Sequence, residues 1–171
     1  MSGTQPVPDS GPALLSLYDE ALPEVYGYLL ARCGRRALAE DLTAETFLAA
    51  VQACRSGSPP LSTGWLVGIA RHKLVDHWRD LERLDRKLRL LDTDEVDDPW
   101  DAELDALLAR EVLDALSPQH RASLTLRYLD GLPVAEVATV LGRTEQATEA
   151  LLVRARHAFR RTYTALEGGP A

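Results

Sequence analysis

The side chains with the clearest chemical potential lie in a basic and aromatic run at residues 65–79. Arg71, His72 and Lys73 stand together within it, and Trp78 stands near its end. Basic groups bind phosphates and aromatic rings stack on bases, so this composition suits contact with a nucleic acid. A helix with aromatic residues in the core and basic residues in solvent explains the run equally well.

A second segment, residues 133–144, has the pattern of two helices joined by a tight turn. Ala138 is a small residue where a second helix would cross, and Gly142 permits left-handed backbone geometry at the turn. Thr144 provides a cap for the helix that follows. This pattern is typical of a helix-turn-helix, which lays its second helix in the major groove of DNA. A plain helical hairpin ending on a glycine is the alternative.

Other kinds of chemistry find little support in the sequence. His72, Asp76 and His77 lie within about one helical turn, but no further cluster completes a metal site. Cys33 and Cys54 lack the paired spacing of zinc ligands, so we expect core thiols. The sequence contains no glycine-rich phosphate loop and no nucleophile motif. We therefore expect no enzyme, no small-molecule substrate, no metal and no cofactor.

Helical periodicity extends over most of the 171 residues. Apolar residues recur at three- and four-residue steps, which predicts helices over about 13–33, 36–54, 63–91, 104–116, 118–128, 133–141 and 144–166. Pro23 is a point at which the first helix could kink or break. Ser117 and Pro118 form a cap and first-turn pair, and Gly131 ends the helix that they open. No strand of consequence is expected.

The net charge of −7 is concentrated in one segment, because residues 92–114 carry ten acidic side chains and one basic one. The start of this segment, around Pro99, has the composition of a solvated linker. We therefore predict an all-α fold of two small helical domains, 13–91 and 104–166, joined by an acidic linker at 92–103. Residues 1–12 are expected to be a disordered tail and residues 167–171 a second tail. A single domain with an acidic surface loop is the alternative.

Composition also bears on location. No apolar run approaches the roughly 20 residues of a membrane span, and residues 1–12 do not resemble a signal peptide. Two cysteines are too few for a disulfide scaffold. These features favour a cytoplasmic protein that is not inserted in a membrane.

Two sets of motifs, in this order and spacing, resemble the bacterial sigma factors of the extracytoplasmic-function (ECF) group, in their minimal two-domain form. The first set comprises Leu17-Tyr18, the segments 37–47 and 65–71, Asp76 and Arg79. The second set comprises the segments 116–121, 126–128, 131–132, 136–138, 141–142 and 154–156. The resemblance covers roughly residues 13–90 and 104–162.

The resemblance implies a protein that binds core RNA polymerase, recognises two promoter elements and helps to open the DNA. The residues implied for core polymerase are Glu40, Asp41, Glu45 and Phe47. The residues implied for the minus-ten element are Ser62, Thr63, Arg71, His72, Lys73 and Arg79. The residues implied for the minus-thirty-five element are Arg143, Thr144, Gln146, Glu149, Ala150 and Arg154. An anti-sigma factor is a further implied partner.

The segment that would read the minus-thirty-five element departs from the family pattern, because many relatives place Lys and Arg where Glu149 and Leu151 stand. Phosphate would repel Glu149, although its carboxylate could accept a hydrogen bond from cytosine N4. Leu151 could touch a thymine methyl group, and Gln146 could pair with adenine. His72 also stands where family members often have Asn. A helix-turn-helix regulator that acts without polymerase is the alternative function.

Overall fold

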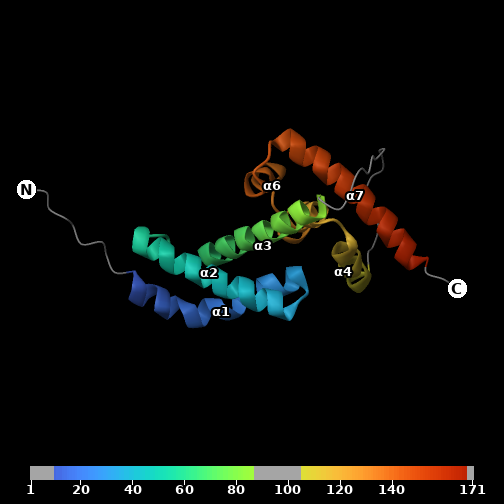
Figure 1. Ribbon diagram of the computed structural model, residues 1–171. Helices are drawn as coiled ribbons and strands as arrows, with labels where there is room; N and C mark the ends of the chain where they lie inside the picture. Colours follow the sequence, from blue (N-terminus) through green and yellow to red (C-terminus); the bar gives the residue numbers. More distant parts are fainter. Residues whose placement is uncertain (1–9, 87–104, 169–171) are drawn as a thin grey trace, which may run out of the picture. The chain divides into compact units, whose positions relative to one another are not determined.

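The computed structural model describes residues 10–86 and 105–168, and the regular structure in these two ranges is entirely helical (Figure 1). The helices are α1 (Gly11–Cys33), α2 (Arg36–Ser56), α3 (Thr63–Arg86), α4 (Ala106–Ala115), α5 (Pro118–Leu124), the π-helix η1 (Thr125–Leu129), α6 (Val134–Leu141) and α7 (Glu145–Glu167). The predicted all-α class is therefore confirmed. The acidic stretch at 92–103 lies outside the described residues.

The described residues group into two units that divide within α3, between Asp76 and His77. The first unit holds α1, α2 and the start of α3, while the second holds the end of α3 together with α4–α7. Sequence reasoning instead assigned all of α3 to the first domain. Polar contacts link the end of α3 to residues of α5 and α6.

The first unit is built on the pairing of α1 with α2, which run side by side (Figure 1). Val25 and Leu29 of α1 and Leu42 of α2 are buried in its core. Helix α1 starts in the expected tail, at Gly11, and it continues through Pro23 without a break. Pro23 has no amide N–H, so one carbonyl in the preceding helical turn lacks its usual donor. Pro23 is exposed, so that carbonyl lies on the solvent side of the helix.

The second unit is organised around α7, against which α4, α5 and α6 all pack. Its core cluster consists of Val112, Leu124, Leu152, Ala155 and Phe159. The Asp105 side chain caps the start of helix α4, because it accepts hydrogen bonds from the amides of Leu107 and Leu108, each at 2.9 Å. Leu107, near the start of α4, is 83% exposed.

The helix predicted over 118–128 changes character at Thr125, where α5 gives way to the π-helix η1. The amide of Asp130 closes η1 on the Thr125 carbonyl at 3.0 Å. Gly131 then takes a φ of 69°, in the left-handed region, and the chain turns towards α6. The predicted stop at Gly131 is therefore confirmed.

Candidate nucleic-acid interface

The turn between α6 and α7 has the geometry that its sequence predicts. Gly142 ends α6 with a φ of 64°, and the Arg143 amide donates to the Ala138 carbonyl at 2.9 Å. The Thr144 hydroxyl accepts a hydrogen bond from the Ala147 amide at 3.1 Å, which caps α7. Ala138, the small residue of the pattern, is buried. The segment is therefore a helix-turn-helix.

The start of α7, together with the turn before it, presents one exposed polar face. Its members recur at three- and four-residue steps, so they share one side of the helix. Those exposed there are Arg143, Thr144, Gln146, Glu149, Ala150 and Arg154. The structure thus brings together every residue that the resemblance implied for the minus-thirty-five element, although the Thr144 hydroxyl is engaged as the cap.

Leu151 does not belong to this face, because its side chain is fully buried. It lies with Thr148, Leu152 and Ala155 on the side of α7 that forms the core. The suggestion that Leu151 touches a thymine methyl group is therefore wrong. The apolar side chain at this position is part of the buried side of α7. It does not stand in the place of a basic side chain that contacts DNA.

The residues expected at the minus-ten element are divided between the two units. In the first unit, His72 is exposed, while Arg71 and Lys73 are half-buried. The Lys73 ammonium lies 3.9 Å from the carboxylate of Glu45 on α2. Arg79 belongs to the second unit, where its guanidinium donates to the Leu141 carbonyl at 3.0 Å.

The loop before α3 contributes one capping group and one helical residue. The Ser62 hydroxyl accepts a hydrogen bond from the Trp65 amide at 3.1 Å, so this side chain fixes the start of the helix. Thr63 is the first residue of α3 and is half-buried. Ser62 remains exposed, which keeps its oxygen within reach of a partner.

Three carboxylates on α2, those of Glu40, Asp41 and Glu45, are exposed as expected. Phe47 is only 9% exposed, and its ring centroid lies 4.7 Å from that of Tyr18. The assignment of Phe47 to core polymerase stays a prediction, and the structure places its ring in the core between two helices. The ring is buried because it belongs to the seam between α1 and α2.

A groove of about 860 Å³ follows this seam, and sequence reasoning missed it. Leu15 of α1 and Leu48 of α2 line it, and they are 73% and 63% exposed. Tyr18 and Val51 also line it and are partly exposed. The sequence feature that could have indicated the groove is Leu48. It is an apolar residue three positions after Glu45, outside the buried stripe of α2.

The described ranges contain no group of three or more His, Cys, Asp or Glu side chains able to hold a metal ion. Cys33 and Cys54 are both buried free thiols. Within the same ranges, no helix combines the length and apolar character that crossing a membrane requires.

Comparison with protein families assigns both units to one class. Residues 17–84 match the family model described as Sigma-70 region 2, and residues 106–158 match the one described as Sigma-70, region 4. The chain is 42% identical over 149 residues to the ECF RNA polymerase sigma factor BldN of Streptomyces coelicolor. That match covers 81% of this chain but only 56% of BldN, so the chain spans little more than half of that relative.

A second relative matches over nearly its whole length. The ECF RNA polymerase sigma factor SigL of Mycobacterium tuberculosis is 32% identical over 158 residues, which are 86% of each chain. The sigma factor RpoE of Bartonella quintana, solved with the anti-sigma factor NepR, has a similar fold with a TM-score of 0.55 at 18% identity. That match covers 90% of this chain and 98% of RpoE.

The two region matches, together with the helix-turn-helix, define a protein of the sigma-70 class. The chain belongs to the ECF RNA polymerase sigma factors.

Proposed function

We propose that this chain binds core RNA polymerase, directs it to promoters with two recognition elements and helps to open the DNA. The observation that carries the proposal is the exposed polar face on the helix-turn-helix, which follows a capped and correctly formed turn. The role is one of binding, and we propose no chemical step for it. The cytoplasm, where polymerase acts, is the location we propose.

Helix α7 is the element that we assign to the minus-thirty-five sequence. The N-terminal part of a recognition helix contacts base edges in the major groove. Gln146 can pair with adenine, and Glu149 can accept from cytosine N4. Arg143 and Arg154 flank these two residues and suit phosphate oxygens. The face therefore combines two groups for reading bases with two groups for positioning the helix.

The start of α3 is the element that we assign to the minus-ten sequence. Arg71 and Lys73 offer positive charge for phosphates, and the exposed His72 ring offers a hydrogen-bonding and stacking surface. Ser62 and Thr63 provide hydroxyl groups at the adjoining helix start, suited to the polar edge of an extruded base. A base taken out of the stack needs polar and planar groups of this kind.

Helix α2 is the element that we assign to core polymerase. Glu40, Asp41 and Glu45 are three exposed carboxylates, and opposite charge on a partner steers association. Leu48 follows Glu45 by about one turn and adds exposed apolar area beside the charges. The partner surface is therefore expected to be basic with an apolar strip.

An anti-sigma factor is the regulatory partner that we propose. The similar sigma factor RpoE was solved in complex with an anti-sigma factor. The groove lined by Leu15, Tyr18, Leu48 and Val51 is suited to the apolar side of a partner helix. An inhibitor seated there would cover Leu48 and crowd the carboxylates of α2.

The decisive experiment is transcription by bacterial core polymerase with and without this chain, on a genomic promoter library with sequencing of transcripts. We expect chain-dependent transcripts whose start sites share two spaced motifs. Co-purification with core polymerase tests the alternative of a free-standing regulator. DNA binding without any association with core polymerase would favour that alternative.

A further inference from the structure

Arg143 lies on the turn of the helix-turn-helix, directly before the cap residue Thr144. Its backbone is fixed, because its amide donates to the Ala138 carbonyl at 2.9 Å. Its side chain is exposed. An exposed arginine has several rotatable bonds and a large rotamer entropy, so a fixed backbone alone does not fix the guanidinium. A group that orients this guanidinium must come from another part of the chain.

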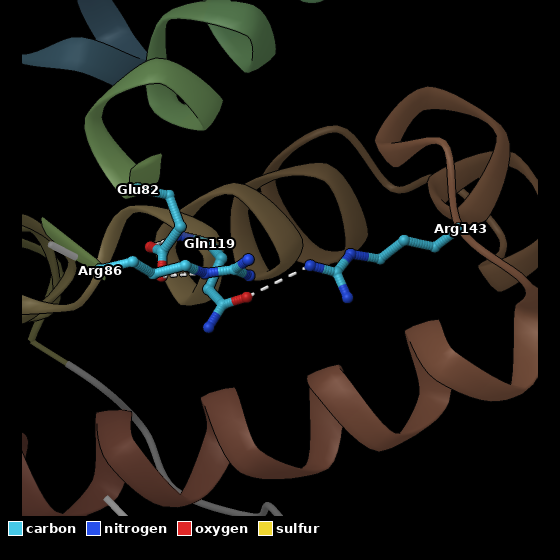
Figure 2. Close-up of polar contacts among 4 residues, drawn as sticks. All are labelled: Glu82, Arg86, Gln119 and Arg143. Atoms are coloured by element: carbon cyan, nitrogen blue, oxygen red, sulfur yellow. Dashed lines mark hydrogen bonds and ion pairs between the residues drawn. The ribbon is translucent and has the colours of Figure 1, made fainter. Parts of the chain in front are cut away.

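A side chain of α5 supplies that group within the second unit. The Gln119 side-chain oxygen accepts a hydrogen bond from Nη2 of Arg143 at 3.3 Å, as Figure 2 shows. Gln119 stands in the first turn of α5 and is half-buried, 24 positions before Arg143. Its backbone amide is engaged separately, because it donates to the Glu82 carboxylate at 3.1 Å and not to the cap residue Ser117. The side-chain bond thus links the start of α5 to the turn before α7.

The bond to Gln119 leaves Arg143 able to bind a phosphate. A guanidinium carries five N–H donors, and this bond uses one of them. The remaining donors keep the planar fork that matches phosphate oxygens. A side chain that is already held loses less conformational freedom when it binds, and this strengthens binding. Gln119 therefore prepares Arg143 for a phosphate and does not compete with the phosphate for it.

We propose that Gln119 is a positioning residue for promoter binding, which orients Arg143 towards a phosphate of the DNA backbone and does not itself contact DNA. The inference rests on the proposed DNA-binding function, in which Arg143 belongs to the face for the minus-thirty-five element. Gln119 has no part in the DNA contacts that the resemblance implies. Through Arg143, α5 contributes to DNA binding without touching the DNA.

A double-mutant cycle separates positioning from direct contact. The probe is a promoter duplex recovered from the transcription library, bound by the full-length chain together with core polymerase. Gln119→Leu should weaken binding about threefold, which is the effect of one lost hydrogen bond, and Arg143→Ala about tenfold. The double variant should bind no more weakly than Arg143→Ala, because Gln119 acts only through that side chain. Additive losses overturn the proposal, because Gln119 would then act on DNA or on the fold by itself.

Gln52→Leu is the matched control, since it makes the same change at an exposed position of α2. The control should bind the duplex as the parent chain does, because Gln52 belongs to the other unit and to none of the DNA-binding sets. Gln119→Leu must bind more weakly than this control. Equal binding by the two variants overturns the proposal.

A measurement without DNA tests the positioning alone. Nitrogen-15 relaxation of the arginine Nε–H groups reports how freely each guanidinium moves on the ps–ns timescale. We expect Arg143 to be more ordered than the exposed Arg36, to lose that order after Gln119→Leu and to keep it after Gln119→Glu, which retains an acceptor at the same length. An Arg143 as mobile as Arg36 in the parent chain, or unchanged by Gln119→Leu, overturns the proposal. An ordered Arg143 in a chain that forms no promoter complex contradicts the proposed function instead.

Discussion

At the scale of the residue, Glu149 carries a charge that would oppose DNA on the surface that we propose for DNA binding. It is exposed on α7 between Gln146 and Arg154. Glu149→Lys removes one negative charge and adds one positive charge near phosphate. We expect about tenfold tighter binding of the full-length chain to duplex DNA at low salt, with a log–log salt slope steeper by about one. A salt titration of binding measures both quantities.

Glu167→Lys is the control for this substitution, because it makes the same charge change at the exposed C-terminal end of α7. It should alter DNA affinity much less than Glu149→Lys. Equal effects of the two substitutions would mean that net charge, not the position of Glu149, determines the result. Unchanged or weaker binding by Glu149→Lys would contradict the placement of Glu149 near phosphate.

Leu151 provides a second test at this scale, because its burial separates a core role from a DNA role. The side chain is fully buried, so Leu151→Ala should destabilise the second unit by about 2–5 kcal/mol. Leu107→Ala, at a leucine that is 83% exposed, should change stability by less than about 0.5 kcal/mol. Urea unfolding of both variants measures the difference. Similar stability of the two would contradict the placement of Leu151.

At the scale of the element, the turn of the helix-turn-helix depends on the backbone freedom of Gly142. Its φ of 64° is unfavourable for a residue with a Cβ atom, so Gly142→Ala should cost about 1–2 kcal/mol. Gly27→Ala, in an exposed position inside α1 with open space around a Cβ, should stabilise by about 0.5–1 kcal/mol. Thermal unfolding should therefore shift in opposite directions for the two variants. A stabilising Gly142→Ala would contradict the turn geometry.

Turn glycines and helix caps predicted where the helices begin and end, because these residues act on the backbone within a few positions of themselves. The turn glycine Gly142 and the cap Thr144 act through their own backbone neighbourhood, and the structure has both as expected. Ser117 is the exception, since an identical local signal is overridden by a carboxylate from α3, 35 positions away. Contacts between distant segments leave no periodic trace in the sequence.

The candidate sites follow the same rule. The residues on the exposed face of α7 were implied by the resemblance, and their helical spacing is consistent with a shared face. The thymine contact suggested for Leu151 was wrong because resemblance identified the right helix, while the side that a residue faces is decided by packing. The apolar groove needed both α1 and α2 in place, since Leu15 and Leu48 lie on different helices.

At the scale of the whole molecule, the two units are expected to divide the work between polymerase and DNA. The exposed carboxylates of α2 lie in the first unit, and the polar face of α7 lies in the second. A repressor that acts alone has no need of the first of these surfaces. If the chain acts as a sigma factor, substitutions in the first unit should weaken polymerase binding and leave DNA binding intact. A free-standing regulator would show no such separation.

Reversing charge on α2 tests that separation. Glu40→Lys combined with Asp41→Lys should weaken binding to core polymerase about tenfold or more, because a basic partner surface would then be repelled. Binding of the full-length chain to duplex DNA should not weaken, since added positive charge does not repel phosphate. Glu20→Lys with Glu24→Lys makes the same charge change on exposed positions of α1 and should leave polymerase binding nearly intact. Equal losses in the two double variants would show that overall charge governs association, and no loss in either would remove α2 from the polymerase interface.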